Sequence, residues 1–462
     1  MSVEAIEAAP ARGVANDTAI LDGAILPTMV RLSLPNMAAM LATSLVAIAE
    51  TGYVGTFGTS SLAGLACVVP MVMLQQMMSG GAMGSSVSSA VSRALGAGDE
   101  ALARKIALHA VVIGGCAGLA FMTFFLTYGG TAYQLLGAKG DALQQAMAYS
   151  NVVFIGVFGL WLTNTCASII RGGGNMKVPS ATLLLAALSQ IGIGGALGFG
   201  WLGLPRLGIA GVACGQLIVF NVSAVFLLFY LASARSRVRL GFRDGSLSWP
   251  IFRDILKVGG FACLSPLQSV LTVLVLTRLV SSFGTEALAG YGIGSRLEFL
   301  LIPIAFAIGV ACVPMVGMAL GAGRVARARQ VAWTGGLFSA ALVGCVGVVV
   351  AVWPDLWAAL FTRDAAVLAS ARLYFTWAGP TYVLFGLGLC LYFSSLGAGK
   401  VFGPMMAGTL RLLLVAIGGW WLAANQTPVW TIFALISAAM AVYGIVTALS
   451  VYGTSWEAET AR

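Results

Sequence analysis

The stretch SLVAIAETGYVGTFG, residues 44–58, places one carboxylic acid, Glu50, inside a long run of apolar and small residues. An ionised carboxylate inside a membrane-spanning helix costs about 2.5 to 3.5 kcal/mol, so it must face a polar cavity, find a partner or stay protonated. Burial penalises the charged form of a carboxyl, which suits a group that binds and releases a proton. Glu50 is therefore either a proton- or ion-binding residue, or a structural acid that lies near the outer interface or pairs with Arg278 or Arg296.

Other polar residues also interrupt apolar segments and are candidates to line a polar cavity. They are Asn164, Gln190, Gln216, Gln268, Arg296 and Glu298. Amides can hydrogen-bond a carboxyl in either protonation state, whereas a sodium ion prefers more anionic oxygen ligands. An acid with amide neighbours would therefore favour protons over sodium ions.

Glu298 is the acidic candidate of the second half of the chain. It lies two residues from Arg296, and two such positions on a helix point about 200° apart, so the two side chains are not expected to pair. Glu298 is then either a cation site or a structural anchor.

The eight cysteines stand singly, without metal-ligand spacing, and His109 is the only histidine. These residues predict packing and structural roles and no metal site or cofactor. Hydrolytic or redox machinery is not visible either, so we expect a protein that is not an enzyme.

The amino-acid composition indicates that these residues belong to a membrane protein. Of 462 residues, 59% are hydrophobic and 9% are charged, far below the roughly 25% of charged residues in soluble domains. A bilayer core needs roughly 20 apolar residues per helix, and about a dozen segments qualify. The expected spans are 32–56, 62–92, 102–127, 143–170, 179–201, 207–232, 253–282, 287–319, 327–353, 367–395, 404–424 and 429–453.

The placement of the basic residues explains the net charge of +9. Of the 25 Lys and Arg residues, alternate connections place 19, Arg411 among them, on one side and four on the other, with Arg278 and Arg296 inside spans. Positive residues collect on the cytoplasmic side, so we expect a multi-pass protein of the cell (inner) membrane with both termini in the cytoplasm. Lipid phosphates are expected partners of these residues, and nucleic acid is not.

The chain repeats itself with an offset of 225 residues. Gly96 and Gly98 of SRALGAGDEALARK match Gly321 and Gly323 of MALGAGRVARARQ, and Tyr149 matches Tyr374. Glycines in these loops supply positive φ at helix ends, and glycines inside the spans permit close helix packing.

Two six-helix halves with the same orientation follow from this repeat, related by a pseudo-twofold axis along the membrane normal, as in transporters. The fold class is an all-α integral membrane protein of twelve transmembrane helices. The expected parts are a cytoplasmic tail 1–21, an N-lobe 22–240, a cytoplasmic linker 241–253, a C-lobe 254–455 and a cytoplasmic tail 456–462.

Several motifs in this order resemble the multidrug and toxic compound extrusion (MATE) family of transporters. They are GSSVSSAVSRALGAGDEALARK, RGGGNMKVP, GYGIGSRLEFLLIP, and the later GAGR and GAGK loops. The resemblance extends from about residue 25 to 453. It implies two lobes in a V shape, alternating access, and export of amphiphilic, usually cationic, organic compounds in exchange for inward protons or sodium ions.

The resemblance also assigns Glu50 a role. Glu50, Thr51 and Gly55 match a first-helix pattern in which the acid is usually Asp, and that acid couples ion flux to transport. The chain departs from the family elsewhere, because Gly194 stands where relatives place a fifth-helix acid, and amide and hydroxyl groups stand near Gln268 where others place a seventh-helix acid. Gln190 and Gln216 stand where relatives place an asparagine and a small hydroxyl residue, so the resemblance gives Glu50 amide neighbours. We expect a monomeric antiporter coupled to protons.

Two alternatives remain open. A flippase of lipid-linked sugars, from the same superfamily, would line its cavity with several arginines, and only Arg278 and Arg296 are available inside the spans. A membrane receptor or scaffold that transports nothing would not require a duplicated bundle with a buried acid.

Overall fold

The protein is all-helical in a computed structural model that describes residues 19–241 and 247–456. Within these ranges, eleven helices are long and apolar enough to cross a membrane, and the bent pair α6 and α7, which meet at 44°, makes a twelfth span. The prediction of twelve transmembrane helices is confirmed. Most of the expected tails, 1–21 and 456–462, and the middle of the linker 241–253 lie outside the described residues.

The first six spans form the N-lobe. They are α2 (Ile25–Gly55); α3 (Thr59–Gln76) with the π-helix η1 (Met77–Met83) and α4 (Gly84–Gly96); α5 (Glu100–Leu135); α6 (Gly140–Ile155) with α7 (Val157–Gly172); α8 (Lys177–Phe199); and α9 (Gly208–Ala232). The 3-10 helix η2 (Trp201–Gly203) connects α8 to α9.

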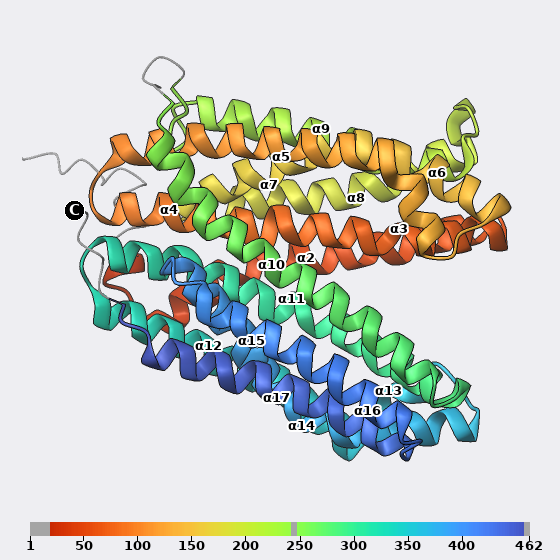
Figure 1. Ribbon diagram of the computed structural model, residues 1–462. Helices are drawn as coiled ribbons and strands as arrows, with labels where there is room; N and C mark the ends of the chain where they lie inside the picture. Colours follow the sequence, from red (N-terminus) through yellow and green to blue (C-terminus); the bar gives the residue numbers. More distant parts are fainter. Residues whose placement is uncertain (1–18, 242–246, 457–462) are drawn as a thin grey trace, which may run out of the picture.

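The other six spans form the C-lobe. They are α10 (Trp249–Ser281); α11 (Thr285–Gly321); α12 (Val325–Val352); α14 (Ala365–Gly397); α15 (Phe402–Leu413) with the π-helix η3 (Leu414–Gly418) and α16 (Gly419–Ala424); and α17 (Val429–Gly453), with the short α13 (Asp355–Ala358) before α14. Figure 1 shows the two lobes converging at the end that carries both described termini and diverging at the other end.

Two helix starts differ from the sequence-based expectation. The first span begins at Ile25 rather than at 32, and α10 begins at Trp249, so 249–253 belong to a helix and not to the linker. Residues 19–21 of the expected tail are helical, and Ile20 is 2% exposed. The backbone oxygen of Ile20 accepts a hydrogen bond of 2.7 Å from Arg327, which fixes this segment against the C-lobe.

The repeated glycines have two structural roles at the converging end, positive φ in the loops and close contact between helices. Gly98 and Gly323 have φ of 78° and 73°, in the left-handed region that favours glycine, as their loop positions predict. Gly96 and Gly321 instead allow α4 and α11 to touch across the two lobes. A Cβ on Gly96 would lie 2.2 Å from the Met318 oxygen, and one on Gly321 would lie 2.1 Å from the Arg93 oxygen.

Hydrogen bonds reinforce this contact between the lobes. The Ser89 hydroxyl on α4 donates to the backbone oxygen of Gly397 at 2.9 Å, and the Arg93 guanidinium donates to the same oxygen at 3.4 Å. On α12, Arg327 also donates to the Gly23 oxygen at 2.7 Å. The converging end is thus closed by backbone contact and hydrogen bonds together.

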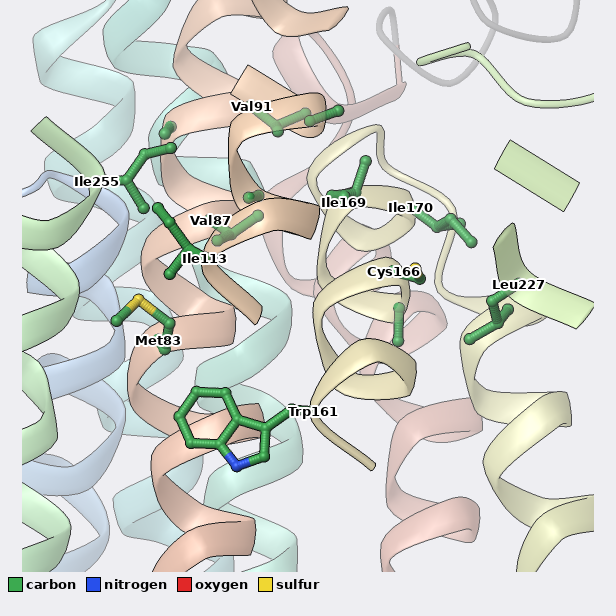
Figure 2. Packing of buried hydrophobic residues seen from close by; sticks show 14 of the residues in the cluster. Met83, Val87, Val91, Ile113, Trp161, Cys166, Ile169, Ile170, Leu227 and Ile255 are labelled. Carbon is green, nitrogen blue, oxygen red and sulfur yellow. The ribbon is translucent and has the colours of Figure 1, made fainter. Parts of the chain in front are cut away.

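The hydrophobic core beside this contact spans both lobes. Figure 2 shows Met83, Val87 and Ile113 near Ile255 of α10, with Cys166 on a neighbouring helix. Cys166 is fully buried, in agreement with a packing role. His109 is also buried; its Nδ1 lies 2.7 Å from the Lys105 oxygen, and its Nε2 accepts from the Ser248 backbone N–H at 2.8 Å. The single histidine therefore ties α5 to the start of α10.

We predict that Gly321→Ala lowers the melting temperature of the purified protein, because its Cβ has no room beside the Arg93 carbonyl. Overpacking of this kind costs about 1 to 3 kcal/mol. Gly260→Ala is the matched control, since its Cβ would meet nothing within 4 Å and alanine favours a helix. An equal melting temperature for Gly321→Ala and wild type would contradict the contact.

Candidate functional site

Glu50 lies on α2, five residues before the helix ends at Gly55. At a rise of 1.5 Å per residue, this places it about 7 to 8 Å from the helix end, nearer the diverging end of the lobes than the middle of the span. Its side chain is half-buried. The position leaves Glu50 close to the side on which the two lobes separate.

Both carboxylate oxygens of Glu50 accept hydrogen bonds from neutral donors. The Gln190 Nε2 on α8 donates to Oε1 at 2.8 Å, and the Tyr149 hydroxyl on α6 donates to Oε2 at 3.2 Å. In the described part of the chain, Glu50 makes no ion pair with a lysine or arginine. The alternative in which Glu50 pairs with Arg278 or Arg296 is therefore wrong.

Glycine contacts fix the helix that carries Gln190. A Cβ on Gly215 of α9 would lie 2.7 Å from the Gln190 backbone oxygen, and one on Gly194 would lie 3.0 Å from the Val212 oxygen. Helices α8 and α9 therefore pack backbone against backbone, and this contact limits the rotation of α8. The same contact leaves little space for an acidic side chain at Gly194.

The C-lobe holds a second carboxyl bound by tyrosines. On α11, Glu298 Oε1 accepts hydrogen bonds from the Tyr374 hydroxyl and, at 3.3 Å, from the Tyr382 hydroxyl, both on α14. Gly294 makes the room, because its Cβ would lie 2.1 Å from the Tyr374 ring. Tyr374 and Tyr382 are almost completely buried.

Tyr149 and Tyr374 are equivalent in the internal repeat, yet they bind non-equivalent acids. Glu50 is on the first helix of its lobe, whereas Glu298 is on the second helix of the other lobe. The duplication therefore preserved a tyrosine that donates to a carboxyl, while the helix that supplies the carboxyl differs.

The remaining cavity candidates are not gathered around Glu50. Gln216 is buried on α9 but is not a hydrogen-bond partner of Glu50. The Asn164 amide on α7 donates to the Ser79 hydroxyl at 2.8 Å, next to η1. Arg296 is exposed, and its guanidinium lies 5.0 Å from the centre of the Phe361 ring.

Gln268 lines a small cavity inside the C-lobe together with Arg411. Arg411 was grouped with the cytoplasmic basic residues, but it lies in the last turn of α15, nine residues after the helix begins at Phe402, and η3 continues the span beyond it. About 13 Å of helix separates it from the start of the span. Arg411 is therefore a charge inside the membrane-spanning part.

The three tyrosines that donate to Glu50 and Glu298, and the depth of Arg411, were missed by sequence reasoning. The match between Tyr149 and Tyr374 in the repeat was a signal for two of these residues. Arg411 could have been recognised from its depth in the span 404–424, whereas Tyr382 carries no local pattern that singles it out.

Comparison with known proteins identifies two stretches of the chain, residues 35–194 and 262–421, that each match the family model MatE. One stretch lies in each lobe. The chain is also similar to the probable multidrug resistance protein NorM of Thermotoga maritima, with 24% identity over 75% of this chain and 74% of the relative.

Further relatives cover similar lengths. The FAD transporter of Shewanella oneidensis is 26% identical over 77% of this chain and 78% of its own, and the probable multidrug resistance protein NorM of Deinococcus radiodurans is 26% identical over 85% and 87%. Among solved structures, the outward-facing conformation of a multidrug resistance MATE family transporter has a TM-score of 0.87 at 24% identity, with 96% of this chain and 98% of that chain covered. The similarity confirms the fold.

We predict that Gln190→Leu changes the infrared absorption of the Glu50 carboxyl, because it removes the 2.8 Å hydrogen bond to Oε1. The Glu50 band is assigned by difference from Glu50→Gln. Gln216→Leu is the control, since it removes a buried amide from the neighbouring helix that does not contact Glu50. A Glu50 band that shifts equally in both variants would contradict the specific contact.

Proposed function

From the premise that the chain belongs to the MATE family of transporters, we propose that it is a secondary antiporter that exports amphiphilic, cationic organic compounds in exchange for inward protons. Glu50 is the coupling carboxyl in this proposal. The protein itself is a membrane transporter and not an enzyme, as its family establishes.

The observation that carries the proposal is the set of neutral donors around Glu50. A carboxylate held by an arginine would stay ionised, whereas an amide and a phenol leave it free to take up a proton. The donors come from α6 and α8, so the carboxyl connects three helices of one lobe. When Glu50 binds a proton, one of its oxygens becomes a donor, and the Gln190 amide can rotate to offer its oxygen.

This exchange of partners gives protonation a structural consequence. Helices α2, α6 and α8 are linked through the ionised carboxyl, and neutralisation weakens the charge-assisted bonds that hold them. A bound cationic compound and a proton then compete for the same negative charge, which is the requirement for exchange rather than co-transport.

The arrangement of the lobes supports alternating access. The lobes touch at the end that carries Gly96 and Gly321 and diverge at the end near Glu50. The distribution of basic residues supports a cytoplasmic location for the touching end and both termini, in the inner membrane. Glu50 would then be reached from outside. The proposal also holds that one chain is sufficient and that lipid phosphates meet the cytoplasmic arginines.

The alternatives are separated by the ligands they need. Sodium coupling would require more anionic oxygen around Glu50 than an amide and a phenol supply. A lipid-linked sugar flippase would need clustered arginines, whereas Arg278 and Arg296 are exposed on different helices. Arg411, also within a span, is the one arginine among the residues that line its cavity. A relative named as an FAD transporter indicates that cargo for a protein of this kind extends to large aromatic compounds.

The decisive variant is Glu50→Gln, which keeps the shape of the side chain and removes the titrating group. In vesicles with a proton gradient, a cationic dye such as ethidium should evoke proton movement through the wild type and none through Glu50→Gln, with dye binding retained. Glu286→Gln, at an exposed acid in the first turn of α11, is the control and should behave as wild type.

Three results would contradict this assignment. Dye-evoked proton movement that survives in Glu50→Gln would remove Glu50 from coupling. Transport driven by a sodium gradient alone would move the ion to sodium. If neither a proton gradient nor a sodium gradient drives transport of any dye, the flippase or a protein that transports nothing would be favoured.

We propose that Glu298 is a second proton site, because its contacts with Tyr374 and Tyr382 are also neutral. Glu298→Gln should then lower the number of protons exchanged per dye, measured from the dye gradient that balances a known proton gradient. Glu286→Gln, at an exposed acid in the first turn of the same helix, serves as control. An unchanged exchange ratio in Glu298→Gln would make Glu298 a structural anchor.

A further inference from the structure

Arg411 is a cation inside the membrane-spanning part with no acidic partner in contact. Its guanidinium lies over the rings of Tyr443 and Phe385, at 5.8 and 5.9 Å from their centres. In the part of the chain that the structure describes, it forms no ion pair, and its buried Nε has no hydrogen-bond partner. An arginine at this depth is costly, so it is expected to have a function and a partner.

The surroundings of Arg411 form a polar cavity between α10, α15 and α17. The cavity is lined by Ser265, Gln268, Ser269, Thr272, Gly408, Arg411 and Tyr443. These lining residues include one cation, four hydroxyl groups and one amide, and no carboxylate. Hydroxyl and guanidinium groups can donate hydrogen bonds, so the lining of this small cavity, about 20 Å³ in volume, matches a negatively charged oxygen rather than a cation.

The Gln268 amide is poised to join such a site. Its Nε2 donates to the Thr409 hydroxyl at 2.8 Å, while its buried Oε1 has no hydrogen-bond partner. Rotating the amide by half a turn would let the Thr409 hydroxyl, which donates to the Met405 backbone oxygen at 3.2 Å, donate to Oε1 instead. The NH2 group would then lie beside Gly408, which lines the cavity. Gly408 makes the space, because a Cβ there would lie 2.3 Å from Oε1.

Glu298, the C-lobe carboxyl bound by tyrosines, is not a contact partner of Arg411. It makes no ion pair with Arg411, and its Oε1 is instead bound by the Tyr374 and Tyr382 hydroxyls. The guanidinium donors of Arg411 are therefore not occupied by this carboxyl and stay available to a ligand.

From these contacts we infer that the C-lobe cavity at Arg411 binds a carboxylate or phosphate group, carried by a transported amphiphile or by a lipid headgroup. The inference deepens the proposed function, on which it rests for the cargo, by extending the substrate class to zwitterionic and anionic amphiphiles. Arg411 provides the charge, and the Ser265 and Ser269 hydroxyls and the Gln268 amide provide further donors, whereas the Thr272 hydroxyl already donates to the Gln268 backbone oxygen at 2.7 Å.

The first test measures binding without transport. Sodium benzoate is titrated into the full-length protein in phosphatidylcholine nanodiscs, and the melting temperature is followed by tryptophan fluorescence. A ligand that binds the folded protein raises its melting temperature. Benzoate should stabilise the wild type, and Arg411→Gln should weaken its binding by about tenfold or more, as expected for loss of charge-assisted hydrogen bonds.

Two variants separate binding from folding. Arg278→Gln removes an exposed arginine from α10 and should leave benzoate binding unchanged. Arg411→Lys keeps the positive charge without the planar fork of the guanidinium. It should therefore bind benzoate more weakly than the wild type but more tightly than Arg411→Gln, even where both variants are less stable than the wild type. Absence of stabilisation in the wild type, or equal stabilisation of the wild type and Arg411→Gln, would overturn the inference.

The second test identifies the source of the anion. A cationic rhodamine with a free carboxylate is compared with its methyl ester; Arg411→Gln should weaken binding of the free acid by about tenfold and that of the ester by less than about twofold. Nanodiscs that contain phosphatidylglycerol report on the headgroup, because competition with benzoate that depends on Arg411 would assign the site to lipid. Equal loss of acid and ester in nanodiscs of both compositions would contradict an anion site.

The two proposals fail in different ways. Loss of dye-evoked proton movement would overturn the antiport and leave the benzoate result standing. Absence of benzoate binding would overturn the anion site even in a protein that exchanges cationic dyes for protons.

Discussion

Inside a bilayer, a charged or polar group that lacks a partner costs several kcal/mol, and this constraint governs how the polar residues of the spans are paired. Glu50 is satisfied by Gln190 and Tyr149, and Glu298 is satisfied by two tyrosines. Both solutions use neutral donors, which stabilise a carboxylate without fixing its charge. A carboxyl that must change protonation state in each cycle needs such neighbours.

The same constraint explains the role of the glycines. Helices in lipid gain little from hydrophobic contact with each other, so close backbone packing and hydrogen bonds hold them together. Gly215 lets α9 reach the backbone of α8, which carries Gln190, and Gly96 and Gly321 join the lobes at one end. Rigid packing within a lobe and a narrow contact between the lobes together suit movement of one lobe against the other.

The sequence predicted the parts of this structure that depend on length, period and charge. Twelve spans, the internal duplication and the glycines of the loops follow from patterns that a single chain displays. Glu50 could be singled out because an acid in an apolar run is rare, and Gln190 was among its expected neighbours. The arrangement of two lobes follows from six spans in each half.

The contacts between helices could not be predicted in the same way. Most of these helices are hydrophobic on every face, so the sequence does not tell which face meets which neighbour. Gln190 and Gln216 were equally credible neighbours of Glu50, and only the packing of α8 against α9 and α2 distinguishes them. Arg411 is a different case: it was grouped with the cytoplasmic residues by its charge, although the expected span 404–424 already contained it.

The central claim is that a transported cation and a proton compete for the Glu50 carboxyl. The most direct measurement is the number of protons released when a cationic dye binds the purified protein, obtained by calorimetry in buffers of different ionisation enthalpy. The wild type should release protons on binding, and Glu50→Gln should release fewer while still binding the dye. Equal proton release from both proteins, or none from the wild type, would contradict the claim.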